Sequence, residues 1–198
     1  MRFKSLFFVK TALLTRYSVY AIEATVHAPS LEGIYSEIYR VLKPGGTFGV
    51  YEWLMTDKYD NTNVEHRKIR LGIEQGNGIS NMVTISEGIR AMKAAGFVLE
   101  VNEDLAKRPD ATPWYYPIAG DFSMLGSVYD LFTVARMTWW GRGIAHRLMR
   151  AMEIARIAPP GTQKSADNLA VAADNLVAGA KLDLFTPMYF MVGRKPLN

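Results

Sequence analysis

The apolar positions in the first quarter of the chain predict two strands joined by a helix. Residues 18–23 form a short run of β-branched, aromatic and small apolar side chains, which is typical of a buried strand. From Ser30 to Leu42, leucine and isoleucine recur at helical spacing, and a Pro-Gly-Gly turn follows at 44–46. A second strand is expected at 47–53. A strand, a crossover helix and a second strand form a βαβ unit, which predicts a parallel sheet.

Beyond this unit the pattern predicts further helices and two more strands. The expected elements are a helix from Asn63 to Ile73, a helix from Thr84 or Ser86 to Gly96, a strand over 97–101, two or three helices between 105 and 179, and a last strand over 184–195. The region between the third and the last strand is about half of the chain. A mostly helical insert of this size must do more than close the sheet.

The composition is that of an ordinary globular domain, with 198 residues, 49% apolar and 21% charged. The absence of cysteine excludes disulfides, thiolate metal sites and cysteine nucleophiles. No run of about 18 apolar residues is present that would span a bilayer. A net charge of +4 is mild, and we expect no nucleic-acid partner. The charge is uneven, because residues 136–164 hold six Arg or Lys and one Glu.

Polar side chains follow both predicted strands of the βαβ unit. Glu23 and His27 come after the first strand. Glu52 and Trp53 end the second. The carboxyl ends of parallel strands form the ligand crevice of open α/β sheets, so these residues are candidates for a functional site. The alternative is a solvated strand end, or side chains that cap the next helix. Glu74 precedes the turn QGNG, which is not a phosphate loop because it follows a helix and not a strand.

Other kinds of site find less support in the sequence. The three histidines, at 27, 66 and 146, lie far apart and without a partner pattern, so we expect no metal site. No serine nucleophile elbow is present. The aromatic loop Trp114, Tyr115 and Tyr116 can fill the core, or it can line a pocket for a large apolar ligand.

Several motifs together resemble the sterol 24-C-methyltransferase family. They are YAIEATVHAP at 20–29, EIYRVLKPGGTFGVYEWLMTDKYD at 37–60, EHRKIRLGIEQGNGI at 65–79, PWYYPIAGD at 113–121 and LFTPMYFMVGRKP at 184–196. The segment RVLKPGG alone is shared by many methyltransferases, whereas YEWLMTDKYD beside IEATVHAP is far more specific. The resemblance runs from about Val19 to Pro196.

The resemblance implies a partial class I, Rossmann-like methyltransferase sheet with S-adenosyl-L-methionine as methyl donor and a Δ24 sterol as acceptor. Methyl transfer to the side-chain double bond leaves a carbocation, which is followed by a hydride shift and loss of a proton. Carboxylates, aromatic faces and one base suit such a reaction. The residues at the family's motif positions are Glu23, His27, Glu52 and Glu74 as catalytic groups, Ala21, Ile22 and Glu23 at the donor, and Tyr20, Tyr51, Trp53, Trp114, Tyr115 and Tyr116 at the acceptor.

The chain departs from the family pattern in two ways. Val26 stands where the family usually has cysteine. The Gly-rich turn and the acidic strand end that bind the donor in this fold do not precede Val19. We therefore expect an atypical segment at 1–17, the second half of the methyltransferase domain at 18–104 and the family's C-terminal domain at 105–198. The expectation is a fragment from a truncated or mis-joined gene, which binds the donor weakly by itself.

Two alternatives remain open for such a fragment. It can be a non-catalytic sterol-binding or subunit-interaction protein that uses residues 105–180 as an apolar pocket. In that case other copies of the same chain can be its partners, as a homo-oligomer. It can also be a product that does not fold stably, because an exposed sheet edge favours aggregation.

The segment 136–156 predicts a helix with two different faces. Ile144, Leu148 and Ala151 or Met152 form an apolar stripe, Arg142, His146 and Arg150 recur on another face, and Trp139 and Trp140 precede both. One interpretation is peripheral binding to anionic lipid at the endoplasmic reticulum or a lipid droplet, where a sterol is stored, and otherwise a cytoplasmic location. The other is a helix packed in the core with a solvated basic face.

Overall fold

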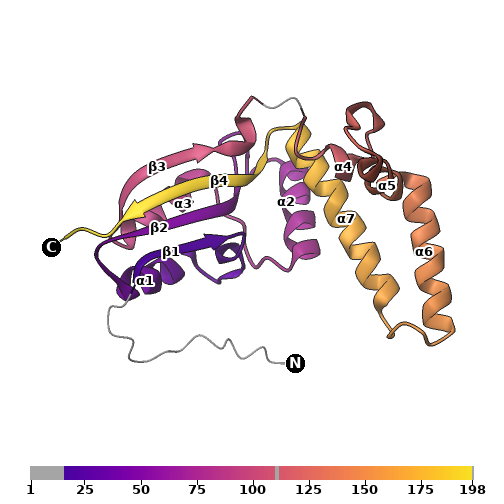
Figure 1. Cartoon of the computed structure of the whole chain (residues 1–198), viewed down its shortest axis with the longest axis horizontal. Helices are drawn as coiled ribbons and strands as arrows, with labels where there is room; N and C mark the ends of the chain where they lie inside the picture. Colours follow the sequence, from indigo (N-terminus) through magenta and orange to yellow (C-terminus); the bar gives the residue numbers. More distant parts are fainter. Residues whose placement is uncertain (1–15, 110–111, 198) are drawn as a thin grey trace.

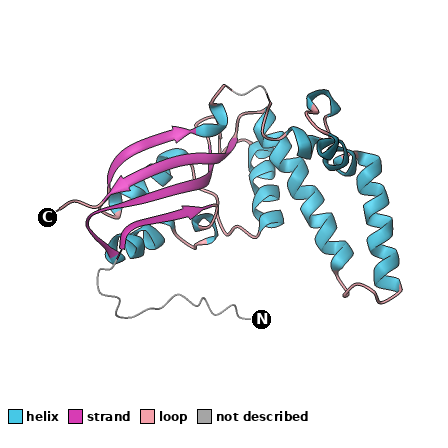
Figure 2. Cartoon of the chain, in the orientation of Figure 1, coloured by secondary structure: helices cyan, strands magenta, loops and turns pink. Residues whose placement is uncertain are grey.

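The computed structural model describes residues 16–109 and 112–197, and it has an α/β architecture (Figures 1 and 2). Four strands form one sheet in the order β1-β2-β4-β3: β1 (Arg16–Ile22), β2 (Leu42–Met55), β3 (Val98–Asp104) and β4 (Phe185–Arg194). β1 and β2 are parallel, as the βαβ pattern predicts. β4 runs antiparallel to both of its neighbours, because the insert brings the chain back into the sheet at the end where β2 and β3 finish, with Met55 paired to Phe185 and Asp104 to Tyr189. The sheet is therefore mixed and not purely parallel.

The helix between β1 and β2 begins where the sequence predicts. α1 (Leu31–Val41) is capped by Ser30, whose side chain accepts from the amide of Gly33 at 3.2 Å. β2 starts immediately at Leu42, so the Pro-Gly-Gly segment lies inside the strand. Gly45 takes a left-handed φ of 77°, which accommodates the bend there. The second strand is thus longer than its apolar pattern predicts.

One face of the sheet holds the main apolar core. α1 and α3 (Ile85–Ala94) cover this face, and Figure 1 shows both helices on the same side. α3 begins with a capping box between Thr84 and Glu87. Fully buried side chains at the centre of this layer include Tyr35, Phe48 and Met191.

The opposite face of the sheet is open. Tyr20 is 81% exposed and Ile22 is 59% exposed, so the prediction of a buried first strand is wrong. β1 is an edge strand, and Figure 1 shows no helix over most of this face within the described residues. Tyr51 on β2 stands opposite Phe190 on β4, with ring centroids 5.1 Å apart. Apolar side chains therefore continue across three strands without a covering layer.

The insert is helical, as expected, and it packs beside the sheet. Its helices are α4 (Tyr116–Ala119), α5 (Val128–Met137), α6 (Trp139–Ile154) and α7 (Thr162–Lys181), with short 3₁₀ turns η2 (Leu105–Lys107) and η3 (Phe122–Met124). α7 packs against α2 (Val64–Asn77), which precedes the insert in sequence. Figure 1 shows the α6–α7 hairpin extending away from the sheet. A second apolar cluster, with Ile73, Leu176 and Phe185, joins α2 and α7 to the first residue of β4.

Candidate active site

The carboxyl ends of β1 and β2 lie side by side and carry the candidate residues. Glu23 follows β1 with a left-handed φ of 51°, and its amide donates to the carbonyl of Tyr51 at 3.1 Å. The chain then forms the 3₁₀ turn η1 (Thr25–His27). His27 Nδ1 lies 3.4 Å from the carbonyl oxygen of Gly78, at the end of α2. A single tight turn thus presents Glu23 and His27 at one edge of the sheet.

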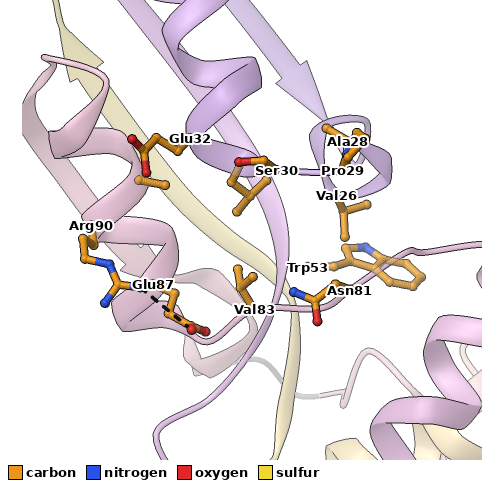
Figure 3. A pocket seen from close by; sticks show the side chains of 12 residues that line it. Val26, Ala28, Pro29, Ser30, Glu32, Trp53, Asn81, Val83, Glu87 and Arg90 are labelled. Carbon is orange, nitrogen blue, oxygen red and sulfur yellow. Dashed lines mark ion pairs between the residues drawn. The ribbon is translucent and has the colours of Figure 1, made fainter. Parts of the chain in front are cut away.

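Two pockets open at this edge. The first, which we call the rim pocket, has a volume of about 220 Å³ and is lined by Glu23, Val26, His27, Trp53, Asn77 and Ile79. The second, which we call the helix pocket, has a volume of about 210 Å³ and lies toward α1 and α3; its polar lining is Ser30, Glu32, Asn81, Glu87 and Arg90 (Figure 3). Val26 and Trp53 line both pockets and therefore separate them. Glu23, His27 and Trp53, which the sequence singles out, meet in the rim pocket.

Glu52 lies beneath this edge and lines neither pocket. Its side chain is completely buried on the α1 side of β2. Glu52 Oε2 accepts from the Thr25 hydroxyl at 2.5 Å and from the Tyr35 hydroxyl at 2.7 Å. Oε1 is buried without a well-formed hydrogen bond among the described residues. Burial raises the pKa of Glu52, and hydrogen bonds from the two hydroxyls lower it only in part. Burial, followed by the charge of Glu52, also raises the pKa of Tyr35.

Glu74 is also held by protein groups and lines neither pocket. Its Oε1 accepts from Arg70 Nε at 2.8 Å and from the amide of Met82 at 2.8 Å. These contacts connect α2 with the segment that leads into α3. Asn77, which lies one helical turn further along α2, reaches the rim pocket instead. The sequence does not predict this, because Glu74 and Asn77 lie about one turn apart on the same helix and either could face the pocket.

The aromatic candidates separate into two groups, of which the first surrounds Phe185. Trp53 packs edge-on against Phe185 at 5.4 Å, and Trp114 packs against the same ring at 5.9 Å. Tyr115 stands perpendicular to Trp114 at 5.6 Å, and Tyr116 begins α4. The indole N–H of Trp53 is buried without a hydrogen-bond partner among the described residues. Phe185 therefore links the rim pocket to the insert.

The second group of candidates lies on β1 and on the open face of the sheet. Tyr20 and Ile22 are exposed there, and Tyr51 packs on Phe190. Ala21 points the other way and contacts the main core. None of these side chains lines either pocket. The motif resemblance assigned these residues to the donor and acceptor sites together with their sequence neighbours. Successive residues of a strand point to opposite faces of the sheet, so such neighbours do not share one site.

Thr25 and Tyr35 are polar residues of this region that the sequence pattern did not single out. Both are buried, and both donate to Glu52. Tyr35 lies four residues after Leu31 on the apolar side of the predicted helix. A tyrosine on a buried helix face usually needs a partner for its hydroxyl, and that signal was available in the sequence.

The apolar stripe of α6 faces solvent, which is the opposite of the core-packed arrangement considered from the sequence. Ile144 and Leu148 are each 58% exposed, so the interpretation as a core-packed helix is wrong for this stripe. Arg142 Nη1 lies 2.6 Å from Asp174 Oδ1, and His146 Nδ1 lies 2.8 Å from Asp167 Oδ1. Two of the three members of the predicted basic face, Arg142 and His146, therefore contact carboxylates of α7.

A metal centre and a membrane span are two other features that residues 16–109 and 112–197 could carry. No group of three or more His, Cys, Asp or Glu side chains in this part of the chain is placed to hold a metal ion. Within the same residues, no helix has the length and apolar character needed to cross a membrane.

Comparison with known proteins supports the motif resemblance. Residues 132–197 match the family described as sterol methyltransferase C-terminal. The chain is 71% identical over 179 residues to the sterol 24-C-methyltransferase erg6 of Aspergillus fumigatus, and 68% identical over 181 residues to erg-4 of Neurospora crassa. The resemblance to sterol methyltransferases is confirmed. The matches cover 90% and 91% of this chain but 48% of each relative, so the chain spans about half the length of the curated relatives.

The fold is similar to that of solved methyltransferases. A geranyl diphosphate C-methyltransferase from Streptomyces coelicolor, solved with S-adenosyl-L-homocysteine, superposes with a TM-score of 0.55 at 15% identity. The match covers 90% of this chain and 47% of that one. This likeness confirms the class I methyltransferase architecture for the sheet and its flanking helices.

Proposed function

We propose that this chain functions in sterol C24 methylation, with S-adenosyl-L-methionine as methyl donor and a Δ24 sterol as acceptor. The observation that carries the proposal is the 71% identity, over 90% of the chain, to a protein named sterol 24-C-methyltransferase. The donor supplies an electrophilic methyl group on a sulfonium. Glu23 fits such a group, because its carboxylate follows the carboxyl end of a parallel strand and remains exposed. Ala21 and Ile22 would place the backbone that leads to it.

The rim pocket offers the groups that an alkene methylation needs. The carboxylate of Glu23 favours positive charge beside it, and the ring of Trp53 adds an aromatic face. A hydrogen on His27 Nδ1 would face the carbonyl oxygen of Gly78 at 3.4 Å, which leaves Nε2 free to accept a proton. Val26 and Ile79 supply the apolar lining for a hydrocarbon side chain. We assign His27 as the base and Glu23 as the group that stabilises positive charge.

A chimera tests this function. This chain replaces the matching half of the Aspergillus fumigatus relative, and transfer of labelled methyl from S-adenosyl-L-methionine to a Δ24 sterol is measured. We expect turnover in the chimera and a kcat on the order of 10²-fold lower in Glu23→Gln, with a smaller change in KM. Glu37→Gln is the matched control, because Glu37 is exposed on α1 and, among the described residues, pairs with Arg40 alone.

Two results would count against the proposal. A chimera that binds donor and sterol without methyl transfer would favour the alternative of a non-catalytic sterol-binding protein. Equal turnover in Glu23→Gln and Glu37→Gln would show that Glu23 lies at a solvated strand end and has no role in catalysis.

We also propose peripheral membrane contact through residues 136–156, at the endoplasmic reticulum or lipid-droplet surface. Trp139 is 86% exposed, and the stripe that contains Ile144 and Leu148 faces solvent. Arg147 and Arg150 are exposed beside this stripe and make no ion pair with the described residues. Exposed tryptophan, an apolar stripe and unpaired arginines together suit an anionic lipid surface. A sterol is almost insoluble in water, so contact with a lipid store would bring acceptor to the site.

A further inference from the structure

We propose that Glu52 is a positioning residue that holds the turn η1 at the rim pocket through the hydroxyls of Thr25 and Tyr35. It does not reach either pocket, so it acts on ligands only through this turn. The consequence for methyl transfer rests on the proposed function. The consequence for the local structure of the turn does not.

The contacts of Glu52 join three elements at one oxygen atom. Oε2 receives the Thr25 hydroxyl from η1 at 2.5 Å and the Tyr35 hydroxyl from α1 at 2.7 Å. Glu52 itself lies in β2, between strands on both sides. Thr25 is 6% exposed and Tyr35 is fully buried, so water does not compete for these bonds. The turn, the helix and the central strand are therefore connected by a single carboxyl group.

Besides the Thr25 bond, the turn is fixed by the buried side chain of Val26, which packs in the apolar cluster with Met55, and by contacts at its two ends. Glu23 enters it in the left-handed region, and its amide bonds to the carbonyl of Tyr51. His27 leaves it with an exposed, 3.4 Å contact to Gly78. Between these ends, Thr25 makes the buried side-chain bond of the turn. The positions of the two rim-pocket residues, Glu23 and His27, thus depend on a bond that lies directly between them in sequence.

Loss of the Thr25 hydroxyl would leave the buried oxygen of Glu52 with one donor fewer. A buried carboxyl group that loses a hydrogen bond keeps the cost of its removal from water. Residues 23, 24 and 27 are exposed while Val26 is buried, so the turn can relieve this cost by opening toward solvent on its exposed side. The expected consequence is local opening of the turn, and not unfolding of the sheet.

Hydrogen exchange on the intact 198-residue chain tests the local arm of the proposal. We expect Thr25→Val to speed exchange of the amides of residues 24–28 about tenfold, and Thr25→Ser to restore the wild-type rate. Tyr35→Phe should have a smaller effect at the same amides. Tyr39→Phe is the matched control, because it removes a hydroxyl one turn further along α1 and leaves the ring packed on Phe97.

Three results of the exchange experiment would contradict the proposed role of Glu52. Unchanged exchange at residues 24–28 in Thr25→Val would overturn the proposal. Equal acceleration in Tyr39→Phe, or a failure of Thr25→Ser to restore the rate, would do the same, because the effect would then reflect general destabilisation.

The chimera provides the catalytic arm. If Glu52 acts through the turn, Thr25→Val and Glu52→Gln should each lower kcat on the order of tenfold, and the double variant should lose little more. If Glu52 contacted the reacting atoms directly, Glu52→Gln alone would lower kcat, and Thr25→Val would leave it unchanged. That second result would overturn the positioning role. Should no chimera methylate a sterol, the proposed function fails, and the exchange experiment still decides the role of Glu52.

Discussion

Glu23 and Glu52 show how two carboxylates at neighbouring strand ends acquire different chemistry. Glu23 follows β1 and Glu52 lies near the end of β2, and both belong to motifs that resemble one family. Glu23 leaves the strand in a left-handed turn and remains exposed at a pocket. Glu52 stays in the strand, points toward α1 and is completely buried. Residue type and position along the strand were therefore not sufficient to separate a group at the pocket from a group beneath it.

The buried state of Glu52 predicts a pH dependence of stability. Its pKa is raised by burial, so the folded chain keeps this proton at a higher pH than the unfolded chain does. The stabilisation is complete below the unfolded pKa of about 4.3 and is lost as pH rises through the folded pKa. Glu52→Gln should remove this part of the dependence. Urea denaturation at several pH values above 4 measures it, with Glu37→Gln as the exposed control. Parallel curves for wild type and Glu52→Gln would contradict the prediction.

At the scale of elements, the contact between α2 and α7 attaches the insert to the rest of the chain. The two helices approach closely where Gly76 faces Ala172. A Cβ atom added at Gly76 would lie 2.1 Å from the Cβ of Ala172, which is far inside van der Waals contact. The same helix carries Asn77 into the rim pocket. Glycine at this position therefore sets both the packing of the insert and the place of a pocket residue.

Gly76→Ala should destabilise the fold, because the helices would have to separate. We expect a loss of about 1–3 kcal/mol in the free energy of unfolding, as for other overpacked contacts. Gly143→Ala is the matched control, since Gly143 also lies inside a helix and an added Cβ there meets nothing within 4 Å. That control should be neutral or stabilising by up to about 1 kcal/mol. Chemical denaturation measures both, and equal effects would show that the α2–α7 contact adapts freely.

At the scale of the whole molecule, apolar side chains remain exposed on several elements. The open face of the sheet carries Tyr20 and Ile22, and the outer stripe of α6 carries Ile144 and Leu148. Exposed sheet edges and apolar patches of this kind mark interaction surfaces or aggregation sites. Beside the α6 stripe, Arg147 and Arg150 make no ion pair with the described residues, whereas Arg142 and His146 on the other face contact Asp174 and Asp167. We therefore propose the α6 surface as the one that contacts anionic lipid.

Liposome flotation tests the membrane contact. We expect the chain to float with anionic vesicles and less with neutral ones, and Arg147→Glu with Arg150→Glu to reduce binding, each basic group contributing about 1 kcal/mol. Arg142 is left unchanged because its ion pair with Asp174 holds the α6–α7 hairpin. Lys68→Glu with Lys93→Glu is the control, since it changes the net charge equally on α2 and α3. Equal flotation of the two double variants would argue against docking through α6.

The sequence by itself determined the local elements and the family resemblance. Ser30 and the Thr84 capping box start their helices as predicted, because a cap needs only residues within one turn. The motif residues Glu23 and His27 reach one pocket because a single short turn carries both. These features depend on neighbours in sequence, and a sequence pattern records them directly.

The tertiary structure decided which faces are covered and which polar groups meet. Periodicity shows that Ile144 and Leu148 share a face, but only the position of α7 shows that this face points outward. The strand pattern predicts β4, but its antiparallel place between β2 and β3 depends on the path of the whole insert. Glu52 meets Thr25 and Tyr35 across separations of 27 and 17 residues. Contacts at such distances follow from packing, which no local pattern encodes.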